Sequence, residues 1–148
     1  MKHLIVSIFS LLCLCTACDK MPQNGALDGQ WQLLQVTSLS DQSAQDVKAD
    51  MVYLRFSLDL MEIYTPRTML NGKTNSTMAH FRYEGNTLAI TDLYIHYRDK
   101  DTPLTMPLPE AVQRIGLREV PQTFTITTLT SDRLILQDSK VSLTFRKF

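Results

Sequence analysis

Cysteine is scarce in this chain: it occurs at Cys13, Cys15 and Cys18 and nowhere after them. The region that follows Cys18 therefore has no thiol for an internal disulfide, for a cysteine nucleophile or for a zinc site built on sulfur. Its core must hold the fold through packing and hydrogen bonding, without covalent cross-links.

Charge of one sign and long apolar runs are also missing. The 15 Lys and Arg residues balance the 15 Asp and Glu residues, so the chain has no excess of basic side chains. A nucleic-acid partner requires a basic face, and we therefore expect no nucleic acid to bind. After Cys18 no apolar stretch approaches the ~20 residues that a transmembrane helix needs.

The residue patterns of common catalytic and metal sites are absent as well. After Cys18 the only histidines are His80 and His96, which are too far apart in sequence to match a zinc-binding motif. We expect them on the surface or in the wall of the fold, and we expect no metal or other cofactor. The chain has neither a nucleophile elbow nor a phosphate-binding glycine loop, so it is expected not to be an enzyme.

What the chain does have is a secretory signal at its start. Lys2 is followed by an apolar run over residues 4–14, by the small pair Thr16-Ala17 and by Cys18. A cysteine directly after a small pair is typical of a lipoprotein signal, in which that cysteine is acylated and becomes the new N-terminus. An uncleaved membrane anchor and an ordinary signal peptide are the alternatives.

The signal also predicts where the protein is located. We expect residues 1–17 to be removed, Cys18 to carry the lipid, and residues 18–26 to tether a domain that spans residues 27–148. The membrane partner is then the bilayer that holds the N-terminal lipid, in a bacterial cell envelope. Asp19 retains lipoproteins at the inner membrane in some bacteria, but we expect the outer membrane here.

Alternation of apolar and polar residues dominates the chain from Leu27 onward and predicts half-buried strands. The clearest case covers residues 52–60, where one face is apolar and the other is mixed. The apolar face holds Val52, Leu54, Phe56, Leu58 and Leu60, and the outward face holds Tyr53, Arg55, Ser57 and Asp59. The dipeptides Asn71-Gly72 and Gly85-Asn86 favour tight turns between strands.

One segment is predicted to be helical instead. Residues 109–115 begin with Pro109, which suits the first helical position, and Gly116 suits a C-terminal cap. The buried edge of this helix is expected to hold Ala111, Val112 and Ile115. Strands with close turns and one short helix predict an all-β fold, a small antiparallel up-and-down barrel of about eight strands. Such a barrel is either filled by side chains or holds one small ligand, and both outcomes stay open.

Both ends of the predicted domain resemble lipocalins. The segment DGQWQLL, residues 28–34, is similar to the Gly-x-Trp start of lipocalins, whose tryptophan closes the bottom of the barrel. Residues 124–148 resemble the last three strands of lipocalin-like bacterial lipoproteins, which end in a Leu-x-Phe-x-Lys-Phe strand. The resemblance implies a lipocalin-like barrel in which Trp31 is a core residue. It also implies a basic cover for this ring, Arg146, with Lys147 as the other candidate.

These observations predict a lipid-anchored envelope protein that binds rather than catalyses. The first hypothesis is a small hydrophobic or amphipathic ligand in the barrel interior, against Leu54, Phe56 and Leu58. The alternative is a filled barrel whose outer face or rim binds an envelope protein or acts as an inhibitor. An open apolar cavity would favour the first hypothesis, and a packed interior would favour the second.

Overall fold

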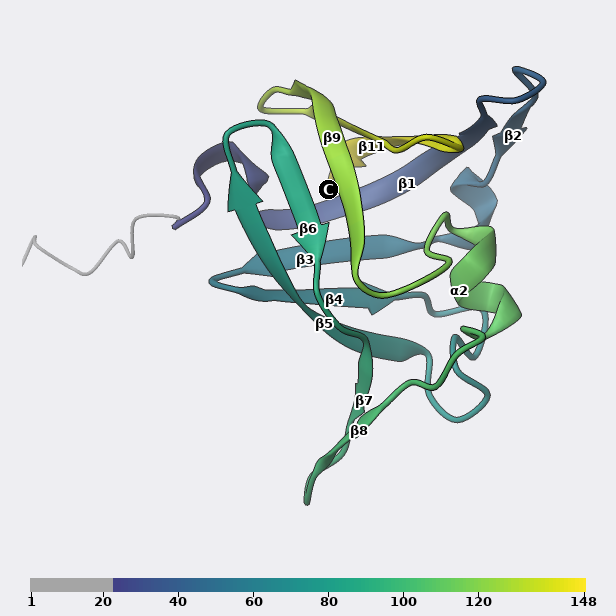
Figure 1. The fold of residues 1–148 in the computed structure, drawn as a ribbon, viewed down its shortest axis with the longest axis vertical. Helices are drawn as coiled ribbons and strands as arrows, with labels where there is room; N and C mark the ends of the chain where they lie inside the picture. Colours follow the sequence, from purple (N-terminus) through teal and green to yellow (C-terminus); the bar gives the residue numbers. More distant parts are fainter. Residues whose placement is uncertain (1–22) are drawn as a thin grey trace, which may run out of the picture.

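Eight strands close into an antiparallel barrel in the computed structural model, which describes residues 23–148 (Figure 1). They are β1 (Gly29–Ser38), β3 (Tyr53–Ser57), β4 (Leu60–Tyr64), β5 (Ser76–Glu84), β6 (Thr87–Ile90), β9 (Gln122–Leu129), β10 (Arg133–Gln137) and β11 (Val141–Lys147). Each strand pairs with the next in this order, and β11 pairs with β1, which gives an up-and-down topology. The predicted all-β barrel of about eight strands with one short helix is confirmed.

Three short strands and one helix lie outside the barrel. β2 (Ala44–Asp46) pairs with β1. β7 (Tyr94–His96) and β8 (Asp101–Pro103) form a hairpin that extends from β5 and projects away from the barrel in Figure 1. The helix α2 (Glu110–Arg114) begins directly after Pro109, within the predicted segment.

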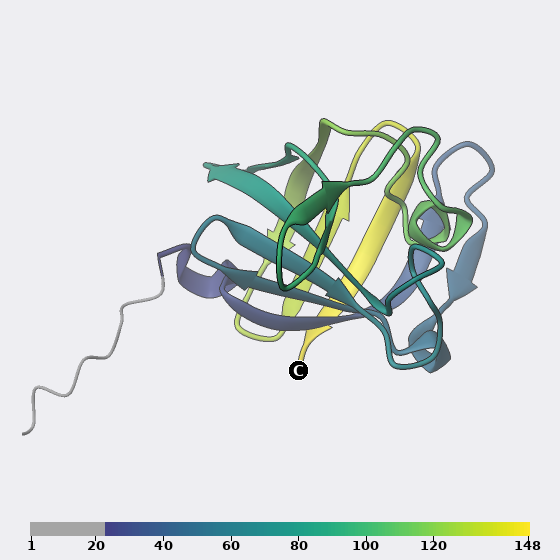
Figure 2. The ribbon, with the colours of Figure 1, turned by 90° about the horizontal axis from the view of Figure 1, so that it is seen from below.

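The two ends of the barrel differ. Short turns at residues 58–59, 85–86 and 130–132 lie at one end, where the 3₁₀ helix η1 (Gly25–Leu27) covers the opening. The long connections gather at the other end, together with α2 and the 3₁₀ helix η2 (Lys48–Asp50). Figures 1 and 2 show η1 and α2 at opposite ends of the barrel. We call the first the closed end and the second the mouth.

Alternating side chains fill the inside of the barrel. Leu54 and Phe56 of β3 are buried there, and every other barrel strand adds buried apolar residues of its own. The bulkiest fully buried side chains are Trp31, Phe124 and Phe145. Within the described part of the chain, no helix has the length and apolar character that crossing a bilayer requires.

Leu58 does not lie in the barrel interior, and the prediction that placed it there is wrong. β3 ends at Ser57, and Leu58 occupies the turn to β4 with a φ of 59°. Its side chain is 55% exposed. Side chains alternate between the two faces of a sheet only while the strand stays extended. When the alternation is continued into a turn, it assigns a buried position to a residue that is no longer part of the strand.

Tyr53 also departs from its predicted environment. It lies on the outer side of β3, where exposure was expected, yet it is only 5% exposed. Its ring stacks on that of Tyr64 and meets the edge of the C-terminal Phe148, with centroids 6.3 Å and 4.9 Å away. The last residue of the chain therefore covers part of the outer wall, which no local pattern around Tyr53 could indicate.

Candidate binding site at the mouth of the barrel

The barrel interior leaves almost no free space. The void among its side chains has a volume of about 10 Å³ and is lined by apolar residues only. They are Leu33, Val52, Leu54, Ile90, Ile115, Leu117, Phe124, Leu136, Leu143 and Phe145. A volume of this size is at most that of one water molecule, and an apolar void of this kind stays dry. The interior therefore has no room for a small-molecule ligand.

Aromatic packing deeper in the barrel contributes to this filling. Phe56 is buried and meets the ring of Phe81 edge-on, with centroids 5.1 Å apart and planes at 85°. Leu54 of the same strand borders the small void. Leu54 and Phe56, the two β3 residues that were correctly predicted to face inward, are thus core residues in this structure.

The α2 segment closes the interior from the mouth. Val112 is fully buried, and Ile115 and Leu117 add two more buried side chains. Gly116 lies between them with a φ of +90°, and a Cβ at this position would be 2.8 Å from a methyl carbon of Leu143. The glycine predicted to cap this helix therefore also allows its backbone to lie directly against β11.

Hydrogen bonds fasten the end of the α2 segment to the barrel. The buried Gln122 of β9 donates from Nε2 to the Gly116 carbonyl and to a carboxylate oxygen of Asp138, both over 2.9 Å. Its Oε1 accepts from the Arg118 backbone N–H over 2.9 Å. The Arg118 guanidinium also pairs with the Asp138 carboxylate. Gln122 and Asp138 together thus hold residues 116–118 in place over the packed interior.

The electrostatics of Asp138 fit this role. Its partial burial acts to raise its pKa, but the N–H groups of Val141 and Lys140 and the nearby Arg118 guanidinium outweigh that effect. The pKa of Asp138 is therefore below its ordinary value, and the carboxylate stays charged at neutral pH.

An open groove of about 320 Å³ runs beside α2 at the mouth. Its apolar lining consists of Val52, Leu70, Ala111 and Ile115. Its polar lining consists of Asp50, Thr65, Thr68, Glu110 and Arg114. We call this the mouth groove. It combines an apolar floor with hydroxyl groups and charges of both signs, which is the composition of a site for an amphipathic partner.

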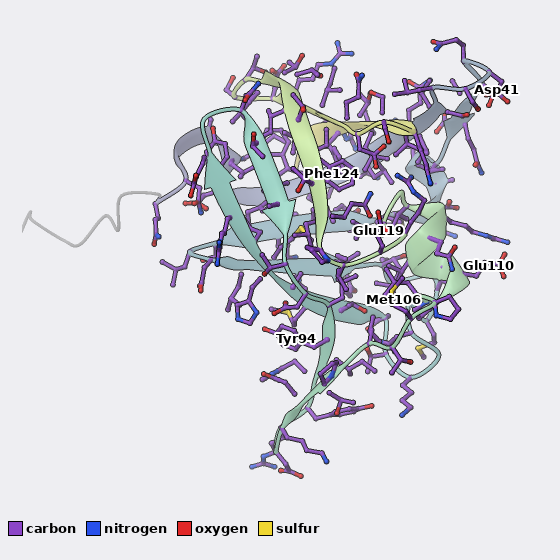
Figure 3. The ribbon with its side chains drawn as sticks, in the orientation of Figure 1. Asp41, Tyr94, Met106, Glu110, Glu119 and Phe124 are labelled. Carbon is purple, nitrogen blue, oxygen red and sulfur yellow. The ribbon has the colours of Figure 1, made fainter. Side chains whose placement is uncertain are left out.

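Local contacts fix the polar edge of the mouth groove. The Thr65 hydroxyl donates to the Asp50 carbonyl over 2.8 Å, which joins the end of β4 to η2. Arg114 and Glu110 form an exposed ion pair of 2.8 Å along α2. Figure 3 shows Glu110 on the outside of α2.

Two exposed methionines belong to the connections at the mouth. Met69 is 59% exposed and stands between Thr68 and Leu70, which both line the groove. Met106 is 54% exposed and lies close to α2 in Figure 3. Methionine side chains are flexible and adapt to differently shaped apolar partners. They therefore extend the apolar character of the mouth beyond the groove itself.

A larger hollow of about 500 Å³ lies on the outer wall of β9 and β10. It is lined mainly by hydroxyl, amide and charged side chains, including Thr123, Thr125, Thr127 and Gln137. It lacks an apolar floor, so burial of a ligand there would contribute little binding free energy. We therefore take the smaller mouth groove as the candidate site.

Trp31 lies at the closed end, away from the mouth groove. It is fully buried, and its indole N–H donates to the Leu27 carbonyl over 2.7 Å. The ammonium of Lys147 lies 4.3 Å from the centroid of the ring, and burial lowers the pKa of this lysine. Arg146 points outward and donates to the Gln32 side chain over 2.9 Å. Of the two candidates for the cover of Trp31, Arg146 is therefore wrong and the alternative, Lys147, is confirmed.

Strand alternation explains why Lys147 takes this place. Phe145 is buried in the core, so Arg146 faces outward and Lys147 faces inward again. Lys147 is also the direct cross-strand partner of Trp31. Counting the alternation back from the core residue Phe145 would have chosen Lys147 from the sequence.

The remaining predicted residues stay apart from the mouth groove. His80 pairs with Asp92 over 2.9 Å and His96 with Asp101 over 2.7 Å, and all four side chains are substantially exposed. Within residues 23–148 no group of three or more metal-binding side chains comes together. The predicted lipidation site, Cys18, lies outside the described residues.

Sequence reasoning missed most of the mouth groove. Ala111 and Ile115 were expected on one edge of the helix, but Asp50, Thr65 and Leu70 come from connections without a periodic pattern. Only the closure of the barrel brings these segments to the same end. The sequence contains no motif that could have indicated them.

Comparison with known proteins agrees with this architecture. A model of the lipocalin-like domain family matches residues 12–148. The chain belongs to this family. Lipocalin-like proteins are typically binding proteins without catalytic activity. A search of curated proteins finds no match for this lipocalin-like chain.

Two solved structures share the lipocalin-like fold. A lipocalin-like protein from Bacteroides uniformis ATCC 8492 is 24% identical and has a TM-score of 0.59, with 84% of this chain and 100% of that chain covered. An uncharacterized protein from Bacteroides eggerthii DSM 20697 is 16% identical and has a TM-score of 0.55, with 82% and 98% covered. At these identities the likeness describes the fold alone.

Proposed function

We propose that this lipocalin-like protein is a lipid-anchored binding module of the bacterial cell envelope and that the mouth groove holds an amphipathic segment of a partner protein. The observation that carries this proposal is the filled interior, whose apolar void measures only about 10 Å³. A packed barrel leaves the outer surface and the rim as places for binding. Among these, the mouth groove combines apolar and charged lining residues.

The form of the groove favours a protein over a small molecule. A small-molecule site usually buries most of its ligand's surface, whereas this groove is open to solvent along one side. An amphipathic peptide segment can place its apolar face on Leu70 and Ile115 and leave its polar face in water. The exposed Met69 and Met106 would then contact the neighbouring parts of the partner.

The anchor part of the proposal rests on Cys18. Acylation there would hold the protein at a bacterial membrane, for which the outer membrane is our expectation. Cys18→Ser should abolish incorporation of labelled palmitate into the full-length chain expressed in a bacterium, because no other cysteine follows a small pair. Continued labelling of the Cys18→Ser protein would show that the lipid is attached elsewhere.

Site-specific photo-crosslinking in intact cells tests the partner. A benzophenone amino acid at Thr68, on the rim of the groove, should give a discrete protein adduct that mass spectrometry identifies. The same probe at Thr125, exposed on the outer wall of β9, serves as the control and should not give this adduct. Ala111→Arg, which fills the groove, should remove the Thr68 adduct, whereas Ala44→Arg on β2 should not.

A small amphipathic ligand in the same groove is the second candidate. The observation that favours it is the volume of about 320 Å³, since small-molecule sites begin at about 300 Å³. Native mass spectrometry of the purified protein distinguishes the two candidates. A bound small molecule that Ala111→Arg displaces, together with no protein adduct at Thr68, would replace the protein-binding proposal. If the Ala111→Arg protein keeps both the Thr68 adduct and any bound small molecule, the groove is excluded as the site.

A further inference from the structure

Neither the backbone conformation nor the packing of the core explains why a leucine occupies position 58. Leu58 stands at the turn between β3 and β4 with a φ of 59°, a conformation that L side chains avoid. The turn between β5 and β6, at the same end of the barrel, reaches the same φ of 59° with Gly85. Two equivalent turns therefore use a glycine in one case and an exposed leucine in the other.

The Leu58 turn is fastened to the point where the chain enters the barrel. The Asn24 side chain donates to the Leu58 carbonyl over 2.8 Å and to the Asp28 carboxylate over 2.6 Å. The Asn24 backbone N–H also donates to Asp28 over 3.0 Å. Hydrogen bonds thus join Asn24, Asp28 and the apex of this turn at the closed end.

The length of chain between Cys18 and Asn24 limits how far this turn lies from a membrane. Six residue steps separate Cys18 from Asn24, and a fully extended chain covers about 3.3–3.6 Å per residue. If Cys18 is acylated, as the proposed function holds, Asn24 lies within about 22 Å of the lipid surface, and the Leu58 carbonyl is hydrogen-bonded to the Asn24 side chain. The mouth lies at the opposite end of the barrel (Figure 1).

We propose that Leu58 is a membrane contact, whose side chain enters the interfacial layer of the bilayer that holds the lipid anchor. Its apolar side chain, 55% exposed at an apex, leaves water when it enters this layer. The carboxylate of Asp59, the next residue, is costly to move into hydrocarbon, so contact is limited to the interface. The closed end then faces the membrane, and the mouth groove faces away from it.

A fluorescent label at position 58 tests this contact. The full-length chain is expressed with its signal, purified in lipidated form and reconstituted into phosphatidylcholine vesicles. Because that form has lost residues 1–17, with Cys13 and Cys15, and carries its lipid on Cys18, Leu58→Cys supplies the only free thiol for an environment-sensitive dye. Met69→Cys, at the mouth, is the matched control because Met69 is 59% exposed, close to the 55% of Leu58. We expect the dye at position 58 to shift its emission to the blue and to be quenched by lipids brominated on their acyl chains, and the dye at 69 to remain water-like.

The outcomes separate this inference from the anchor itself. If the mass shows acylation and the protein floats with the vesicles, but the dye at 58 remains water-like or is quenched no more than the dye at 69, the membrane contact is wrong and the anchor stands. An unacylated protein that does not float removes the anchor, and with it this inference.

A second variant tests whether Leu58 serves the fold instead. Leu58→Gly should unfold at the same temperature as the wild type or above it, because glycine suits a φ of 59° and the leucine side chain is exposed. A lower unfolding temperature would assign the side chain a structural role and would overturn the inference.

Discussion

Truncation of Phe56 to alanine measures how tightly the barrel interior is packed. Phe56 is 2% exposed, and its ring contacts Phe81 edge-on at 5.1 Å. Truncating a buried phenylalanine to alanine costs about 3–5 kcal/mol, and an aromatic pair of this kind contributes about 0.5–1.5 kcal/mol of it. We therefore expect Phe56→Ala to lower the free energy of unfolding by about 4 kcal/mol. Ser57→Lys, at the exposed neighbouring position, should change it by about 0.5 kcal/mol or less.

The assay is urea unfolding followed by the fluorescence of Trp31, the only tryptophan of the chain. Its buried indole should emit to the blue in the folded protein and shift to the red on unfolding. With an m value of about 1–3 kcal/mol/M, a loss of 4 kcal/mol moves the midpoint down by about 1–4 M urea. The variant should also gain affinity for small apolar molecules such as benzene, because the truncation opens a dry cavity.

Two results would refute the reasoning behind Phe56→Ala. A loss below about 1 kcal/mol would show that the side chains around Phe56 are not closely packed. Binding of an apolar dye inside the wild-type barrel, abolished by Phe56→Ala in a protein that stays folded, would show a ligand pocket. The small-ligand hypothesis for the interior would then replace the proposal of binding at the mouth.

Two further predictions concern partly buried charges. Lys147→Met should shift the fluorescence emission of Trp31, because the ammonium group over the ring is removed. Arg146→Met should leave the emission unchanged, because Arg146 points outward. Equal spectra for both variants would contradict the placement of Lys147. Asp138→Asn should cost about 1–3 kcal/mol at pH 7, and Asp99→Asn serves as an exposed control in urea unfolding. The pKa of Asp138 is lowered from 3.8. The difference in the free energy of unfolding between Asp138→Asn and the wild type should therefore have its full size above pH 3.8 and disappear as the pH falls through the lowered pKa. A difference that persists at lower pH would exclude the carboxylate as its source.

The barrel itself could be predicted from short-range patterns. The alternation on β3 correctly placed Leu54 and Phe56 in the interior. The helix predicted over residues 109–115 is present but shorter, Glu110–Arg114, with Pro109 as its non-helical N-cap. The same reasoning failed at Leu58, where the strand turns, and at Tyr53, where the distant Phe148 covers a residue expected to be exposed. Local patterns describe which way a side chain points, but they do not describe what lies above it.

The sequence by itself determined the class of fold, the inward faces of the strands and the place of the short helix, because period two, turn residues and capping residues act over a few neighbouring positions. Whether the barrel is hollow or filled was decided only by the tertiary structure. The volume inside depends on how side chains from eight strands meet those of the α2 segment, among them Ile115, Leu117 and Phe124. The mouth groove likewise exists only because closure of the barrel brings residues near positions 50, 68 and 111 to the same end. Such contacts join residues far apart in the chain, and no local pattern encodes the space between them.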